Sequence, residues 1–143
     1  MNRRNSRIIA MMSLYTKDVN PESTLDEVLS IAIEDDYIEY DKEFLKEIYD
    51  GVLANQSDID YYLSICLKNY TLDRISYIDR ALLRIGSYEL IYTTTPKNIV
   101  INEIVDISKE YSEIDDYKTS KFNNAVLQSI ADKKYETILN VKR

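Results

Sequence analysis

Histidine and tryptophan are absent from this chain of 143 residues, and cysteine, glycine and proline are scarce. Without histidine the chain lacks the commonest general base and the commonest zinc ligand, which excludes Ser-His and Cys-His catalytic pairs. No GxGxxG loop is present, and no GxxxxGK loop followed by Ser or Thr, so a standard phosphate-binding loop is also excluded. We therefore expect a binding protein that is not an enzyme and that uses no cofactor and no metal.

Residues typical of turns are few, and no segment resembles a membrane span. The two glycines and two prolines argue against a β-rich fold, because turns draw heavily on these residues. No run approaches the roughly 18 apolar residues of a membrane span, and the N-terminus lacks the apolar core of a signal peptide. The single cysteine, Cys66, cannot form a disulfide within the chain, which fits a reducing compartment. We expect a cytoplasmic, all-α protein without membrane association.

Apolar spacing at i, i+3, i+4 and i+7 predicts about seven helices. Their approximate ranges are 4–17, 24–35, 41–55, 58–68, 73–93, 99–111 and 119–136. The helix at 73–93 is apolar around much of its circumference, which is typical of a helix with several packed neighbours. No linker, repeat or low-complexity tract divides the chain, so we expect one compact domain over 1–143, with 1–70 and 71–143 as optional subdomains.

Gly51 and Gly86 fall inside predicted helices, where glycine costs about 1 kcal/mol relative to alanine. We expect close helix crossings that exclude a side chain at both positions. The alternative is that the fold simply tolerates the cost.

Charge is distributed unevenly along the chain. The net charge is −7, which taken alone argues against binding to nucleic acid. Residues 1–17 carry four basic residues and no acid, whereas 18–62 carry 14 acidic residues and two lysines. Residues 63–143 are nearly balanced, with 12 basic and 11 acidic residues. A basic tip therefore precedes an acidic first half.

The basic tip is the clearest candidate binding feature. Arg3, Arg4 and Arg7 could hold phosphates, although an ordinary solvated terminus is the plainer interpretation. Tyr15 could stack on an exposed base or pack in the core beside Met12. Candidates that could join the tip, if the two chain ends meet, are Lys133, Lys134, Lys142 and Arg143.

Charged residues elsewhere allow two interpretations each. Arg80 and Arg84 lie four residues apart on the predicted helix 73–93. Paired with acids on neighbouring helices they would be structural, and facing solvent they would extend a binding surface. An acidic cluster at 34–39 could attract a cation but lacks the alternation of a calcium loop, so a solvated helix end is expected.

Three motifs together resemble the NusB family of bacterial transcription antitermination factors. The first is IDRALLRIGSYEL, from Ile78 to Leu90, and the second is INE, from Ile101 to Glu103. The third is KFNNAVL, from Lys121 to Leu127, where Asn123 and Ala125 replace the valine and glycine common in the family. An N-terminal match runs from Arg7 to Tyr15, so the resemblance covers most of the chain.

The resemblance implies a fold of two packed helical bundles and a function. The family binds the boxA element of ribosomal RNA leader transcripts as single-stranded RNA, together with NusE, a small-subunit ribosomal protein. The complex joins the elongating RNA polymerase and suppresses premature termination, and some members form homodimers. By similarity, the RNA-binding residues would be Arg3, Arg4, Arg7, Tyr15, Asp79, Arg80, Lys121, Phe122 and Asn124.

The acidic balance leaves a second function open. A helical adaptor with little or no RNA affinity could use the acidic segment 18–62 to dock a basic protein. The two functions differ in one testable respect, because only the first predicts salt-dependent RNA binding.

Overall fold

The computed structural model describes residues 2–35, 39–68, 70–112 and 118–133, and it contains seven α-helices, one 3-10 turn and no strand within them. This confirms the predicted all-α class. The helices are α1 (Arg3–Val19), α2 (Leu25–Asp35), α3 (Lys42–Ala54), α4 (Gln56–Cys66), α5 (Tyr77–Tyr92), α6 (Lys97–Tyr111) and α7 (Lys118–Asp132), and the 3-10 turn is η1 (Leu72–Arg74).

Side-chain caps fix the starts of three helices. The Asn2 side chain accepts a hydrogen bond from the Asn5 amide at 3.0 Å and starts α1. Asp41 caps α3 and Ser76 caps α5 in the same way, each through the backbone amide three residues later. Since Ser76 begins α5, the predicted helix at 73–93 starts later than expected, after the η1 turn.

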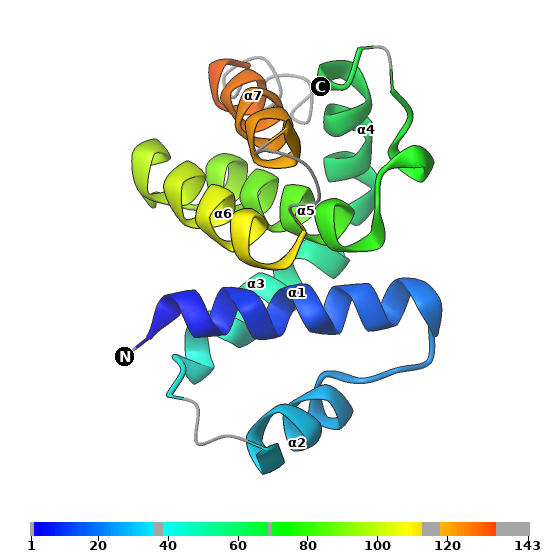
Figure 1. The fold of residues 1–143 in the computed structure, drawn as a ribbon, viewed down its shortest axis with the longest axis vertical. Coiled ribbons are helices and arrows are strands. Elements are labelled where there is room, and N and C mark those ends of the chain that lie inside the picture. Colours follow the sequence, from blue (N-terminus) through cyan, green and yellow to red (C-terminus); the bar gives the residue numbers. More distant parts are fainter. Residues whose placement is uncertain (1, 36–38, 69, 113–117, 134–143) are drawn as a thin grey trace.

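Helix α5 lies at the centre of the molecule (Figure 1). Every residue from Ala81 to Ile91 is buried, and the helix packs against α1, α3, α4, α6 and α7. The predicted many-sided burial of this helix is therefore confirmed, and it explains why the apolar residues are not confined to one stripe.

Both helical glycines sit at close crossings, as predicted. A Cβ atom on Gly86 would lie 2.8 Å from a methyl carbon of Leu127 on α7. A Cβ atom on Gly51 of α3 would overlap the ring of Tyr88 on α5. Glycine therefore lets α5 approach α7 and α3 more closely than any other residue would allow.

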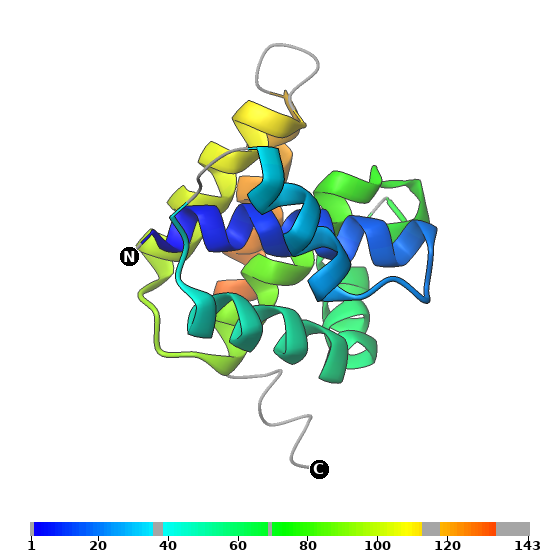
Figure 2. The ribbon, with the colours of Figure 1, turned by 90° about the horizontal axis from the view of Figure 1, so that it is seen from below.

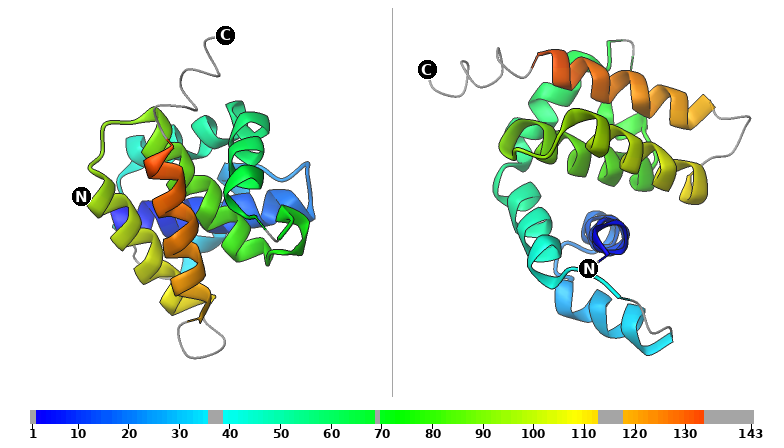
Figure 3. Two further views of the ribbon diagram at one scale, coloured as in Figure 1. Left: turned by 90° about the horizontal axis from the view of Figure 1, so that it is seen from above. Right: turned by 90° about the vertical axis from the view of Figure 1, so that its left-hand side faces the viewer.

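Helix α1 links two groups of helices. Figure 3 shows α1 between the layer of α5, α6 and α7 on one side and α2 on the other. Helix α4 packs mainly against α5 and α7, while α1 and α3 both pack against α5. Helix α5 packs against helices from both halves of the chain. The division into subdomains 1–70 and 71–143 therefore stays a prediction. Within the described residues no helix is long and apolar enough to cross a membrane.

Candidate nucleic-acid interface

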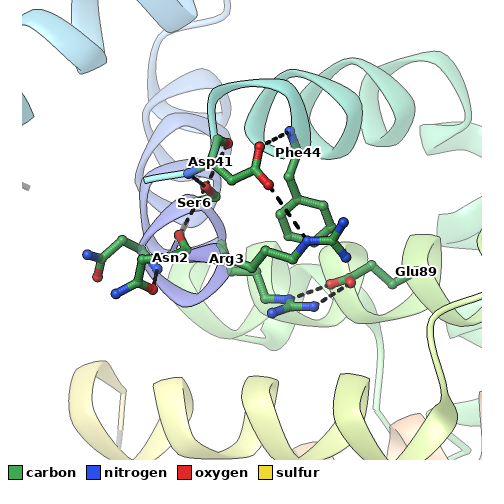
Figure 4. A network of polar contacts seen from close by, with 8 residues as sticks. Asn2, Arg3, Ser6, Asp41, Phe44 and Glu89 are labelled. Atoms are coloured by element: carbon green, nitrogen blue, oxygen red, sulfur yellow. Dashed lines mark hydrogen bonds and ion pairs between the residues drawn. The ribbon is translucent and has the colours of Figure 1, made fainter. Parts of the chain in front are cut away.

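The arginine tip is built on the first two turns of α1, where the Asn2 cap fixes the start of the helix. The Arg3 side chain is 56% exposed, and its guanidinium lies 4.3 Å from the ring centroid of Phe44. Its Nε lies 3.8 Å from a carboxylate oxygen of Asp41, as Figure 4 shows. Arg3 is thus held loosely over α3 with much of its charge facing solvent.

Arg4 points towards α6 and is held more firmly. Its Nε donates to Glu103 at 2.6 Å, and its Nη2 donates to Asp106 at 3.0 Å. The hydrogen bond to Glu103 is the largest cause of a raised pKa for Arg4. The side chain is still 42% exposed, so its charge is partly neutralised but remains within reach of a phosphate.

Arg7 is enclosed within the protein, unlike Arg3 and Arg4. The residue is only 2% exposed, and its guanidinium donates two hydrogen bonds to the carboxylate of Glu89, at 2.8 and 2.7 Å. The Glu89 side chain is fully buried, and Phe44 covers the other face of the guanidinium. This buried bidentate pair gives each carboxylate oxygen of Glu89 one charge-assisted hydrogen bond. The placement does not fit the predicted phosphate contact, and Arg7 is instead a structural link between α1 and α5.

A surface hollow of about 770 Å³ lies beside the arginine tip. Its lining combines the start of α1 with the connection between α5 and α6, and consists of Asn2, Arg3, Arg4, Arg7, Glu39, Thr94, Thr95, Pro96, Ile99 and Glu103. Amide, hydroxyl and guanidinium donors outnumber the acids in this lining, so the hollow suits a polar ligand that accepts hydrogen bonds.

Tyr15 is 40% exposed, so it lies on the surface and does not pack in the core. Its ring meets Tyr77, the first residue of α5, edge to face at 5.9 Å. The guanidinium of Arg80 lies 4.8 Å from the Tyr77 ring centroid, and its Nη2 donates to the carbonyl oxygens of Asp73 and Ile75. Two exposed rings and a cation therefore form one cluster, the tyrosine cluster, from Tyr15, Tyr77 and Arg80.

Asp79 is structural in this arrangement. It is 7% exposed, and its carboxylate accepts hydrogen bonds from Ser76 at 2.7 Å and from the Asn123 amide at 2.9 Å. Asn123 also donates to Ser108 at 3.1 Å. The buried position of Asn123 explains why an amide works here, since it ties α7 to α5 and α6. The predicted contact of Asp79 with RNA does not fit a carboxylate that is already engaged.

Three predicted residues lie in the first turns of α7. Phe122 is half-buried and meets Tyr70 edge to face at 5.4 Å, whereas Lys121 and Asn124 are exposed. Tyr70 and Phe122 form part of the wall of a hollow of about 360 Å³. Its lining consists of Tyr70, Arg74, Ile75, Ser76, Asp79, Lys118, Thr119 and Phe122.

Arg84, the open case from the sequence, is structural. It is 5% exposed and binds Asp60 on α4 and Asp18 on α1 through four hydrogen bonds of 2.9 to 3.1 Å. The Arg84 guanidinium therefore joins α5 to α4 and α1 through these ion pairs.

The two exposed groups lie on one side of α1. Arg4 and Tyr15 are eleven residues apart, which is close to three helical turns and corresponds to about 16 Å along the axis. Arg4 reaches α6 and Tyr15 reaches α5, and these helices belong to the same layer (Figure 1). The exposed Arg4 side chain and the exposed Tyr15 ring thus mark the two ends of one face of α1, which we call the RNA strip.

Sequence reasoning missed Tyr77 of the tyrosine cluster, and it missed Tyr70, Arg74 and Lys118 around the hollow beside Phe122. They matter only because η1 folds back beside α5 and α7, which no local pattern indicates. The described residues contain no group of acids or cysteine arranged to hold a metal ion. Of the terminal basic candidates, Lys133 is exposed, and Lys134, Lys142 and Arg143 lie outside the described residues.

Comparison with known proteins identifies the family. The family model described as "NusB family" matches residues 4–132. The transcription antitermination protein NusB of Listeria welshimeri is 36% identical over 132 residues, which cover 92% of this chain and 97% of the relative. A structure of NusB from T. maritima superposes with a TM-score of 0.78 at 26% identity, covering 97% of this chain and 98% of that one.

A third match is a complex with partner molecules. A crystal structure of the antitermination factors NusB and NusE in complex with dsRNA superposes with a TM-score of 0.74 at 29% identity, covering 90% of this chain and 95% of that one. The family match spans nearly all of the described helices, and the fold agrees over the same length. The chain therefore belongs to the NusB family, whose members are transcription antitermination factors and not enzymes.

Proposed function

We propose that this chain is a transcription antitermination factor that binds single-stranded boxA RNA of ribosomal RNA leader transcripts together with NusE. The bound complex joins the elongating RNA polymerase in the cytoplasm. The observation that carries this proposal is the strip along α1, with exposed guanidinium groups at one end and exposed aromatic rings at the other. The similar chain bound to NusE and RNA supports both partners.

The mechanism is binding alone. Arg3 and Arg4 neutralise phosphates, which supplies affinity that depends on salt but not on sequence. The tyrosine cluster then offers ring faces to unstacked bases, an interaction worth about 1–3 kcal/mol per base. Lys121 and Asn124, exposed at the start of α7, extend the strip with a charge and an amide.

NusE has a clear physical role in this proposal. The chain carries a net charge of −7, and Asp41, Glu103 and Asp106 lie against the two exposed arginines. A basic partner would offset this acidity and raise the affinity of the complex for RNA. The same ion pairs favour the alternative function, a protein-binding adaptor with little RNA affinity of its own.

A fluorescence titration separates the two functions. Labelled boxA RNA is titrated with the protein, with and without NusE, using the wild type and the variants Arg3→Gln, Arg4→Gln and Tyr15→Ala. We expect binding to tighten with NusE and to weaken in all three variants. Lys46→Gln, which removes an exposed positive charge from α3, is the matched control and should bind like the wild type.

If NusE binds while RNA does not bind under any condition, the chain is an adaptor. Light scattering of the same samples tests the homodimer, which stays a prediction from the family resemblance.

A further inference from the structure

A third hollow lies between α1 and α2, about a quarter turn around α1 from Arg4 and Tyr15. Its volume is about 280 Å³, and it is lined by Met12, Thr16, Glu27, Val28, Ile31 and Ala32. Ile31 is 65% exposed and Met12 is 37% exposed, so the walls present aliphatic and thioether groups to solvent. Exposed apolar surface gathered in a groove is typical of interaction sites.

Helix α2 is poorly covered by the rest of the protein. None of the residues 25–32 is buried, and α1 is the principal packing partner of the helix. Figure 2 shows α2 lying across the outer side of α1. An isolated helix of eleven residues is marginal in water, so α2 would gain stability from a further apolar neighbour.

The groove continues along α1. Met12, Thr16 and Val19 follow the i, i+4, i+7 spacing of one helical face, and Val19 is 60% exposed. On α2, Ile31 and Ala32 follow Val28 at i+3 and i+4. Two adjacent rows of this kind form a trough in which a third helix can lie.

The surroundings of the groove are strongly acidic. The segment from Val19 to Asp35 carries five acidic residues and no basic residue. Glu27 stands in the wall of the hollow, and the neighbouring Asp26 is exposed. This charge repels nucleic acid and favours a cationic partner.

We propose that the groove between α1 and α2 docks a basic amphipathic helix of a partner protein. An aliphatic side chain of that helix fills the hollow beside Ile31, and lysine or arginine residues flank it and face the acidic segment. The volume is below the roughly 300–1,000 Å³ typical of small-molecule pockets, which favours a single side-chain anchor over a metabolite. The proposal is independent of RNA binding.

The probe for the test is an 18-residue synthetic peptide of leucine and lysine, with leucines at i, i+3, i+4 and i+7. Binding is followed by fluorescence anisotropy and by NMR chemical-shift perturbation of the full chain. We expect perturbed amides in α1 and α2, and greater hydrogen-exchange protection of α2 in the complex. Ile31→Asp should weaken binding about tenfold or more, as loss of a central anchor does.

Two matched variants and a second peptide complete the design. Ile65→Asp replaces an isoleucine of α4 that is 43% exposed and should leave affinity within about twofold. Glu27→Lys should weaken binding, whereas Glu43→Lys, exposed on α3, should change it much less. The four substituted residues are all exposed, so circular dichroism should show unchanged helix content in every variant.

Several results would overturn the proposal. One is equal binding of a peptide with the same composition but with leucines spread around the helix, because charge alone would then explain the affinity. Perturbations outside α1 and α2 would place the site elsewhere. Competition by RNA would assign the groove to nucleic acid. A wild-type dimer that Ile31→Asp converts to monomer would identify a second copy of this chain as the occupant.

Discussion

The three arginines in the first turns of α1 differ in how much of their charge reaches solvent. Arg3 is largely exposed, Arg4 is shared with two carboxylates, and Arg7 is enclosed with Glu89. Exposed charge can release counterions from RNA, so of these three arginines we propose that Arg3 and Arg4 contribute to salt-dependent binding. Arg7 contributes to stability, and each role is testable by a separate substitution.

The carboxylates around Arg4 should limit RNA affinity. Replacing Glu103 with Gln removes a charge that competes with phosphate, and an exposed pair of this kind is worth about 0.2–1 kcal/mol. We therefore expect Glu103→Gln to tighten RNA binding by about 1.4- to fivefold in a fluorescence titration. Glu43→Gln removes the same charge from an exposed site on α3 and serves as control. Equal tightening by both variants would mean that net charge, and not the Arg4 contact, sets the affinity.

The buried pair of Arg7 and Glu89 should respond very differently. Arg7→Met leaves a buried carboxylate without its partner, which costs about 3–5 kcal/mol of unfolding free energy. Urea denaturation measures this loss. Adding Glu89→Leu removes the orphaned charge and should recover much of the stability. A single variant as stable as the wild type would contradict the assigned structural role.

At the scale of the helices, the crossing of α5 and α7 depends on Gly86. Alanine is the better helix former by about 1 kcal/mol, but its Cβ atom would lie 2.8 Å from Leu127, which is fully buried. Overpacking of this kind typically costs about 1–3 kcal/mol, so we expect Gly86→Ala to be destabilising in urea.

A double-mutant cycle with Leu127→Ala checks the cause. Leu127→Ala alone should destabilise by opening a cavity, but it also makes room for the new Cβ atom. The two changes should therefore cost less together than the sum of their separate costs. Strict additivity would show that the two residues do not compete for space.

Much of the helical architecture could be predicted from sequence because it depends on local periodicity. The spacing of apolar residues predicted all seven helices, and the crossings at Gly51 and Gly86 followed from the cost of glycine within helices. The site was less predictable, because exposure depends on partners distant in sequence. Glu89 lies 82 residues from Arg7 and removes it from the surface. Tyr77 acquires meaning only beside Tyr15, which is on another helix.

At the scale of the molecule, buried tyrosines should make the fold sensitive to alkali. Burial raises the pKa of Tyr92 to about 12, and it also raises the pKa values of Tyr62 and Tyr88. In the unfolded chain these hydroxyls lose their protons near pH 10. Above that pH the folded state holds more protons than the unfolded state, so the free energy of unfolding falls as pH rises from about 10 towards 12.

Urea denaturation at pH 8, 10 and 11 measures this slope. Tyr92→Phe removes one titrating group and should make the slope shallower, while Tyr61→Phe, which is 59% exposed at the surface, should leave it unchanged. A wild-type stability that does not change above pH 10 would contradict the burial of these hydroxyls.

The whole molecule separates its charges by side. The RNA strip joins α1 to α5 and α6, whereas the acidic α2 lies on the other side of α1 (Figure 3). This separation keeps the two exposed arginines apart from the acidic α2 in a protein with a net charge of −7. RNA and a basic protein could therefore bind at the same time without sharing residues.

The salt dependence of RNA binding tests the RNA strip most directly. Three to four phosphate contacts on a single strand give a slope of log K against log salt of about −2 to −3. We expect this slope for the wild-type complex with NusE and boxA RNA. In the Arg3→Gln/Arg4→Gln variant the slope should be shallower by about 1.4, since two contacts are lost. An unchanged slope in the variant would show that the arginine end of α1 does not touch the RNA.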